Sequence, residues 1–322
     1  MFQGIAINAD DNAIDGDFNA LARLLDRAAA VGFDGVEISA GCCNAVRGRR
    51  LVSSEVERAR ALLARYPLRY TLHGPDSLNL ARDPEPAAEV LESCLQLAAG
   101  LGAEVLVYHS GQIALHDAWM GLAPLPDEQA LADLWPRETE ALQRMARRAE
   151  ALGVLIAVEN RDPHLWEVAA LARYGRPATD LVRYHQGMRL DLLCAQMAQV
   201  ASPSVGLCLD VGHAFLAAPY WPEPDYLAAV RAAAPWVRHL HLHDNFGRLD
   251  DIAASMHERL IFGQADNHMP AGWGRIPLRQ VLEALTEAGY SGWVLAEVAP
   301  RYEPYYEEAL ANVRALLPGA CL

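Results

Sequence analysis

The chain has 322 residues, of which 52% are hydrophobic, and it carries a formal net charge of −14. A chain of this length and composition can bury a large core, which excludes a mainly disordered protein. An acidic surface is a poor general attractor for phosphate backbones, so nucleic acid is an unexpected partner unless a local basic groove exists. Bound divalent cations would offset part of the charge.

The cysteine pattern indicates a reducing compartment, and the hydropathy pattern predicts no signal peptide or membrane span. The six cysteines form no CxxC pair, and a chain of this size does not need disulfides to fold, so we expect free thiols. The N-terminal MFQGIAINADDN lacks a basic region followed by an apolar stretch. No run of about 18 apolar residues occurs. We therefore expect a cytoplasmic protein without a signal peptide, a membrane span or a membrane partner.

Short runs of β-branched and apolar residues predict eight strands. In chain order they are FQGIAIN (2–8), GVEIS (35–39), RYTLHG (69–74), VLVYHSG (105–111), LIAVEN (155–160), VGLCLDVGH (205–213), VRHLHLHD (237–244) and WVLAEV (293–298). Stretches at helical spacing lie between them, and several end at Gly, the usual helix stop. These helices are expected at 18–32, 53–66, 86–102, 139–153, 227–234, 277–289 and 306–317.

The alternation of strands and helices predicts the α/β class, with parallel βαβ units. Eight such units close a (β/α)8 TIM barrel. A doubly wound open sheet is the structural alternative, although no GxGxxG follows the first strand. No Ser/Gly/Pro tract divides the chain, so a single domain over residues 1–322 is expected.

Two predicted connections are longer than a minimal barrel needs: 112–138 after the fourth strand and 161–200 after the fifth. Both follow the carboxyl ends of strands, where barrel enzymes build their sites. They carry Trp119, Trp135 and Trp166. Such rings either cover a substrate or pack the loops onto the helices, and the sequence leaves both alternatives open.

Six of the eight predicted strands end in His, Asp or Glu, which a barrel would place on one rim. A lone histidine at a strand end is more often structural than a ligand. Glu159 and Glu297, however, are flanked by apolar residues, and a buried carboxylate needs a cation or several donors to stay charged. The residues concerned are His73, His109, Glu159, Asp210, His213, His241 and Glu297, and the loop ADNHMPAGWG adds Asp266 and His268.

A metal site is the economical explanation of this set. Mixed imidazole and carboxylate ligands suit Zn²⁺, Mn²⁺, Co²⁺ or Fe²⁺ better than Ca²⁺. The cofactor expected is a divalent metal ion (Zn, Mn, Co or Mg), with one to three ions bound.

The segment RHLHLHDN, residues 238–245, places His239, His241 and His243 on one face of an extended strand. Three imidazoles in one row are costly to bury unless their ring nitrogens find partners. The strand pattern alone leaves open which of the three histidines binds the metal.

Seven stretches resemble signature segments of the xylose-isomerase-like TIM-barrel superfamily, which contains the sugar phosphate isomerases/epimerases and the endonuclease IV group. They follow the expected order between residues 69 and 298, whereas the two long insertions fit the pattern less well. The stretches are TLHGPDSLNLA, LVYHSG, VEN, GLCLDVGHAF, HLHLHD, DNHMPAGWGRI and AEV.

The resemblance implies one metal ion held by Glu159, Asp210, His241 and Glu297. His241 is chosen because HLHD, residues 241–244, matches the His-x-x-Asp segment of the superfamily. His239 would then lie deeper, as a support or core residue, and His243 would contact substrate. The endonuclease IV branch implies two further sites, one of His73 and His109 with Glu159, and one of His213, Asp266 and His268.

The preferred function is a divalent-metal-dependent sugar or sugar phosphate isomerase/epimerase. The ion would chelate a carbonyl and the neighbouring hydroxyl and stabilise an enediolate, while Glu159 and Glu297 exchange the proton at either face. Substrate contacts are expected from His73, His109, His213, His243, Trp119 and Trp273. The partner would be a small sugar or sugar phosphate, and association into a homo-oligomer stays open.

The main alternative is an endonuclease IV-like, zinc-dependent phosphodiester hydrolase acting on abasic DNA. All nine metal ligands of that branch are present by residue type, which supports it. The best basic cluster is Arg47, Arg49 and Arg50 in AVRGRR, and it would serve a sugar phosphate equally well. The acidic balance and the aromatic insertions favour the small molecule. A barrel that binds a ligand without catalysis is a third, weaker alternative.

Overall fold

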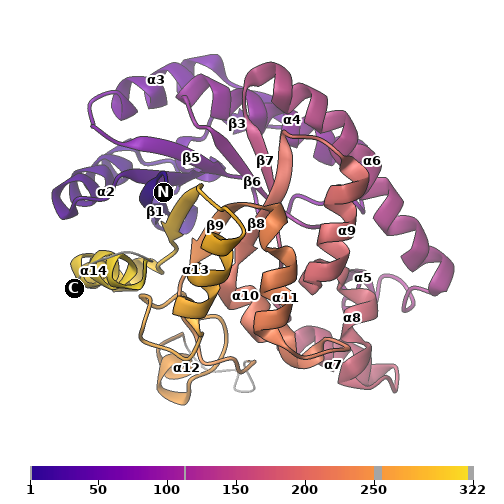
Figure 1. Cartoon of the computed structure of the whole chain (residues 1–322). Coiled ribbons are helices and arrows are strands. Elements are labelled where there is room, and N and C mark those ends of the chain that lie inside the picture. Colours follow the sequence, from indigo (N-terminus) through magenta and orange to yellow (C-terminus); the bar gives the residue numbers. More distant parts are fainter. Residues whose placement is uncertain (1, 112–113, 250–255, 318–322) are drawn as a thin grey trace.

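The computed structural model describes residues 2–111, 114–249 and 256–317, with side chains omitted for residues 256 and 257. Its centre is a closed barrel of eight parallel strands in the order β1-β10-β9-β8-β7-β6-β5-β2, surrounded by helices (Figure 1). The barrel closes where β1 pairs with β10, with Gly4 opposite Trp293. The predicted (β/α)8 TIM barrel is therefore confirmed.

The barrel strands are β1 (Gly4–Ala9), β2 (Gly35–Ser39), β5 (Arg69–His73), β6 (Val105–His109), β7 (Leu155–Glu159), β8 (Val205–Asp210), β9 (Val237–Leu242) and β10 (Trp293–Ala296). One helix of the outer ring follows each of them: α2 (Phe18–Val31), α3 (Ser53–Leu63), α4 (Pro84–Leu101), α6 (Glu128–Leu152), α9 (Leu190–Val200), α11 (Tyr226–Ala233), α13 (Leu278–Glu287) and α14 (Tyr306–Leu316).

The described residues also form shorter elements outside the barrel strands and the ring of helices. They are the hairpin β3 (Val46–Arg47) and β4 (Arg50–Leu51), the helices α1 (Asp11–Ile14), α5 (His116–Trp119), α7 (Leu165–Arg173), α8 (Leu181–Tyr184), α10 (Val211–Ala217) and α12 (Met256–Phe262), and six short 3-10 helices. Among the helices that the structure describes, none combines the length and the hydropathy needed to cross a lipid bilayer.

The predicted elements differ from the observed ones mainly at their carboxyl ends. The strand expected over 205–213 stops at Asp210, whose carboxylate accepts a hydrogen bond from the backbone N–H of His213 at 2.6 Å and so starts α10. Likewise β9 ends at Leu242, one residue before His243. The carboxyl ends of the strands therefore turn immediately into the loops of the site.

The two long connections contain more regular structure than expected. Helix α6 begins at Glu128, capped by Asp127, so the helix expected from residue 139 starts three turns earlier and passes through Pro136. The second connection holds α7, α8 and the ring helix α9. Residues 112 and 113 of the first connection lie outside the described residues.

Alternation along the strands explains why polar groups gather at one end. In β6, Val105 and Val107 share the inward face with His109, and in β7 Ala157 shares it with Glu159. In these two strands the lower inward positions are apolar and the last inward position is ionisable. Free thiols are found at Cys42, Cys43, Cys94, Cys194 and Cys208, whereas Cys321 lies outside the described residues.

A buried carboxylate ties β6 to the outer helices. Glu138 of α6 is fully buried and accepts hydrogen bonds from the Tyr108 hydroxyl at 2.7 Å, the Gly111 N–H at 2.6 Å and the Gln196 amide at 3.1 Å. Because Tyr108 and Gly111 flank His109 and Ser110, Glu138 fixes the end of β6 at the barrel mouth.

We expect Glu138→Ala to lower the free energy of unfolding by about 3 kcal/mol, since it leaves buried donors without an acceptor. Urea denaturation followed by circular dichroism measures this. Glu140→Ala, an exposed position on the same helix, is the matched control and should change stability by less than about 0.5 kcal/mol. Equal effects of the two substitutions would contradict the anchoring role.

Candidate functional site

A polar cavity of about 450 Å³ opens at the carboxyl ends of the barrel strands. Its lining includes His73, His109, His213, Asp266, His268 and Glu297, which come from strand ends or the loops that follow them. These are six of the nine residues that the sequence analysis proposed as metal ligands. The other three, Glu159, Asp210 and His241, are fully buried beneath it.

Glu159, Asp210, His241 and Glu297 converge on one point. One potential ligand atom from each lies within 4.8 Å of the others. The Nδ1 atom of His241 is 3.1 Å from Glu159 Oε1, 3.1 Å from Glu297 Oε2 and 3.9 Å from Asp210 Oδ2. The residues come from β7, β8, β9 and the position after β10, which are consecutive around the barrel. This arrangement can hold one cation between three carboxylates and an imidazole.

Two histidines of neighbouring strands approach the same Glu159 from its other side. His109 Nε2 lies 2.8 Å and His73 Nε2 lies 3.3 Å from Glu159 Oε2. The two imidazole rings meet edge to face, with centroids 4.9 Å apart. The grouping expected for His73, His109 and Glu159 is thus present in space.

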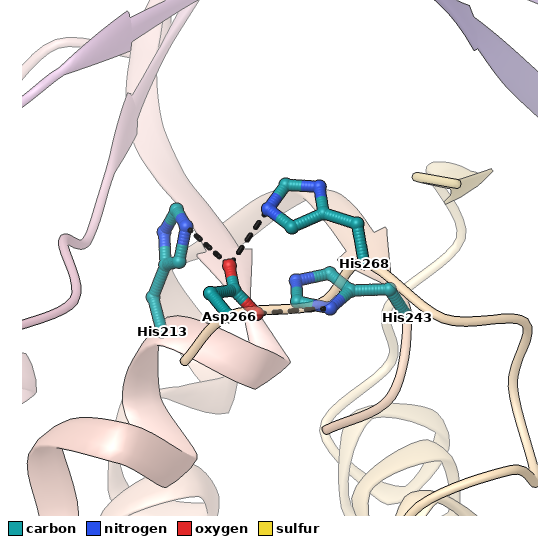
Figure 2. Close-up of side chains that lie close together, drawn as sticks. All are labelled: His213, His243, Asp266 and His268. Atoms are coloured by element: carbon teal, nitrogen blue, oxygen red, sulfur yellow. Dashed lines mark ion pairs between the residues drawn. The ribbon is translucent and has the colours of Figure 1, made fainter. Parts of the chain in front are cut away.

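A second cluster gathers around Asp266. Figure 2 shows its carboxylate between the rings of His213, His268 and His243. Asp266 Oδ2 lies 2.7 Å from His268 Nε2 and 3.3 Å from His213 Nε2, and Asp266 Oδ1 lies 3.5 Å from His243 Nδ1. The predicted trio is therefore joined by His243, which the sequence analysis had assigned to substrate contact.

The three histidines of RHLHLHDN have three different surroundings. His239 Nε2 lies 2.8 Å from Glu37 Oε2 below the mouth, whereas His241 reaches the carboxylate cluster. His243 Nε2 lies 3.0 Å from Asp210 Oδ2, and its ring stacks on His268 at 4.3 Å. A Cβ atom at Gly212 would come within 2.0 Å of the His243 ring, so only glycine fits there. His243 is fully buried and does not line the described cavity.

Glu37 of β2 is the residue that sequence reasoning missed. It is buried, it accepts a hydrogen bond from the Thr71 hydroxyl at 2.8 Å, and its Oε1 lies 3.0 Å from His241 Nε2. Its carboxylate thus faces the ring nitrogen of His241 that points away from the cluster. The signal was available, because Glu37 lies in GVEIS between apolar residues, as Glu159 does in LIAVEN.

Burial and close charges shift the pKa values of these groups, and burial lowers the pKa of His109. Burial raises the pKa of Glu159 and Glu297, but the charges of His109 and His241 on the first, and of His241 and His268 on the second, outweigh it and hold both well below their usual values. Burial lowers the pKa of His73, and the hydrogen bond to Glu159 overcomes this and raises it to about 10.

The Asp266 cluster follows the same logic. Burial raises the pKa of its carboxyl, whereas the charges of His268 and His243 hold it well below its usual value. In the bare protein the imidazoles thus supply the positive charge that the buried carboxylates require. A divalent cation could supply the same charge.

The tryptophans expected over the substrate lie elsewhere. Neither Trp119 nor Trp273 is among the residues lining the described mouth cavity. Trp273 donates its indole N–H to Glu308 at 2.8 Å and packs against Tyr302 and Tyr305. Trp119 lines a neighbouring cavity together with Trp166.

The basic cluster after β2 is also outside this mouth. Arg47 pairs with Glu55 at 2.8 Å and Arg49 with Glu89 at 3.1 Å. In the described lining the one guanidinium is that of Arg161, which donates to the Asp76 carbonyl at 2.9 Å.

Solved sugar epimerases share the fold over almost the whole chain. The structure of an L-ribulose 3-epimerase superposes with a TM-score of 0.66 at 18% identity, covering 99% of this chain and 96% of that one. A D-psicose 3-epimerase from Clostridium cellulolyticum H10 gives a TM-score of 0.65 at 17% identity, covering 98% of this chain and 99% of that one. At these identities the likeness concerns the fold.

A curated relative is similar over part of the chain. The fructoselysine 3-epimerase of Escherichia coli O157:H7 is 29% identical over 150 residues, which are 45% of this chain and 54% of that protein. The match thus spans about half the length of the relative. The family described as xylose isomerase-like TIM barrel matches residues 25–316. The chain belongs to the xylose isomerase-like TIM barrel family.

Proposed function

We propose that the protein is a divalent-metal-dependent epimerase that inverts the carbon next to the keto group of a neutral ketose. The observation that carries this proposal is the convergence of Glu159, Asp210, His241 and Glu297 below the mouth cavity. The 3-epimerase relatives support the choice of reaction.

The residues present fit a bound cation. Glu297 Oε2 is buried, and the Nδ1 atom of His241 lies 3.1 Å from it and 3.1 Å from Glu159 Oε1, while Glu37 lies against the Nε2 atom of His241. A carboxylate behind a ligating histidine fixes its tautomer and ring orientation. When bound, a divalent ion would polarise the ketose carbonyl and make the neighbouring C–H acidic.

We assign the removal and the return of the C–H proton to the two glutamates. Glu159 and Glu297 flank His241 Nδ1 from two sides, and their pKa values are held low, so both are carboxylates able to accept a proton. Epimerisation requires removal of the proton on one face and its return on the other, which two separate carboxylates can perform. His73, His109 and His213 line the cavity and would orient the hydroxyls of the sugar.

The charge of the cavity favours a neutral ketose over a sugar phosphate. Asp10, Asp11, Asp76 and Asp162 share the described lining with Arg161, so the carboxylates there outnumber the guanidinium. A phosphate group would meet several carboxylates there, which disfavours its binding. The same argument disfavours a DNA backbone.

Phosphodiester hydrolysis remains the second candidate function, because the Asp266 cluster lies beside the first one. His243 Nε2 is 3.0 Å from Asp210 and its Nδ1 is 3.5 Å from Asp266. The His243 ring therefore lies between the two clusters and contacts both. Clusters this close could hold neighbouring ions, as two-metal hydrolases do.

Glu159→Gln and Glu297→Gln should each lower the rate of epimerisation by about a thousandfold, since each removes a proton acceptor. Exchange of the C–H hydrogen of a ketose with deuterated solvent, followed by NMR, measures the proton transfer directly. Glu287→Gln, an exposed change in α13, is the control and should retain the activity of the parent. Conversion of the ketose to its epimer at the rate of the parent in both site variants would refute the assigned roles.

Substitutions of His239, of His241 and of Glu37, which contacts both, should separate effects on metal binding from effects on stability. His239→Ala breaks a buried pair with Glu37 and should lower the free energy of unfolding by about 3 kcal/mol. Glu37→Gln should weaken metal binding by about 10–100-fold through His241, and His241→Ala should weaken it further. Stability is measured with a chelator present, and affinity by competition with a chromophoric chelator. A stronger metal defect in His239→Ala than in His241→Ala would mean that the wrong imidazole has been chosen.

Incubation with duplex DNA containing an abasic site, at low salt and with added Zn²⁺, should give no more strand cleavage than the Glu159→Gln variant. The variant reports any contaminating nuclease, because it is purified in the same way. Cleavage by the parent protein alone would instead favour the hydrolase.

A further inference from the structure

We propose that the substrate is larger than one sugar, and that a second, neutral sugar ring occupies the cavity lined by Trp119 and Trp166 beside the barrel mouth. This inference rests on the proposed function, because the reacting ketose unit is taken to lie in the mouth cavity. It names the part of the substrate that does not react.

The second cavity has a volume of about 590 Å³ and adjoins the first. Asp162, His164 and Asp266 line both. Volumes of roughly 300–1,000 Å³ are typical of small-molecule sites, so two adjoining cavities offer more room than one ketose uses. These three shared polar residues mark the border between the two cavities, here called the neck, where we place the bond that joins the two sugar units.

The chain itself links the reactive centre to the aromatic walls. Six residues separate Glu159, at the end of β7, from Trp166 in α7. The start of α7 is fixed by Glu167, which is fully buried, accepts from the His164 N–H at 2.8 Å and lies 3.0 Å from His185 Nδ1. Trp166 is therefore held in a fixed position relative to Glu159.

Trp119 comes from the other long insertion and meets Trp166 across the cavity wall. Helices α5 and α7 pack against each other, and the centroids of the two indole rings are 6.1 Å apart. The guanidinium of Arg173 lies 3.9 Å from the centre of the Trp119 ring and holds it in place. The two insertions thus cooperate to build this cavity.

The chemistry of the walls selects the occupant. Indole rings, with Leu165 and Leu216 near them, suit the apolar face of a sugar ring, while Asp162 and His164 at the neck can bind its hydroxyls. Arg173 already occupies the position over Trp119 that a ligand cation would take. Asp162 and Asp266 outnumber Arg259 among the charged residues of the lining, so an anionic group is also disfavoured.

The test compares fructose with palatinose and turanose, two glucosyl-fructose disaccharides that keep a free keto carbon. Deuterium exchange gives kcat/KM, and calorimetric titration of the same sugars gives affinity without turnover. For the metal-loaded parent we expect at least one disaccharide to exceed fructose by about tenfold in both readouts.

Trp166→Ala should abolish that preference and leave the values for fructose within about twofold of the parent. Ala169→Phe, which fills the same cavity without removing packing, should have the same effect. Trp236→Ala removes a partly buried indole at the opposite end of the barrel, before β9, and should keep the preference.

Several results would overturn the inference. They are equal values for fructose and both disaccharides, equal losses for all sugars in Trp166→Ala, or a Trp166-dependent preference for the cationic fructoselysine over both disaccharides. If no sugar exchanges deuterium but a disaccharide binds more tightly than fructose through Trp166, the second cavity stands and the epimerase proposal fails.

Discussion

Burial of carboxylates around His241 is the constraint on which the rest of the site depends. Glu37, Glu159 and Asp210 are almost completely buried, and Glu297 joins them from the loop after β10. Carboxylates removed from water need compensating charge or donors. The imidazoles at the mouth supply it in the bare chain, and a cation would supply it more completely. This requirement explains why so many histidines occupy strand ends that could otherwise be apolar.

The barrel places these groups without distorting its own structure. His109, Glu159 and Asp210 end three neighbouring strands at the same rim, so residues far apart in sequence meet there. His239, His241 and His243 show how sharply position matters within one strand. The first pairs with Glu37 beneath the mouth, the second faces three carboxylates, and the third lies past the strand end against Gly212 and Asp210. Histidines only two positions apart along the chain therefore have entirely different contacts.

The insertions extend this rigid centre outward. The segment after β7 carries Glu159 at its base and Trp166 at its tip, and the buried Glu167 fixes the turn between them. The segment after β6 carries Trp119, and hydrogen bonds from Tyr108 and Gly111 to Glu138 fix the point where this segment begins. A buried carboxylate anchors each insertion, so the aromatic walls are part of the packed structure.

The sequence by itself determined the barrel, because hydrophobic periodicity and the βα alternation are local signals. It also indicates the acids and histidines that gather at the mouth, since an acid or a histidine after an apolar run is visible without coordinates. Glu37 was equally visible but was overlooked, because GVEIS does not place its acid at the strand end. Only the tertiary structure decided that Glu37 faces His241, that His243 joins Asp266, and that Trp119 lies beside Trp166 and away from the mouth. These contacts join residues distant along the chain, and their geometry is set by how strands and insertions pack, which no local pattern encodes.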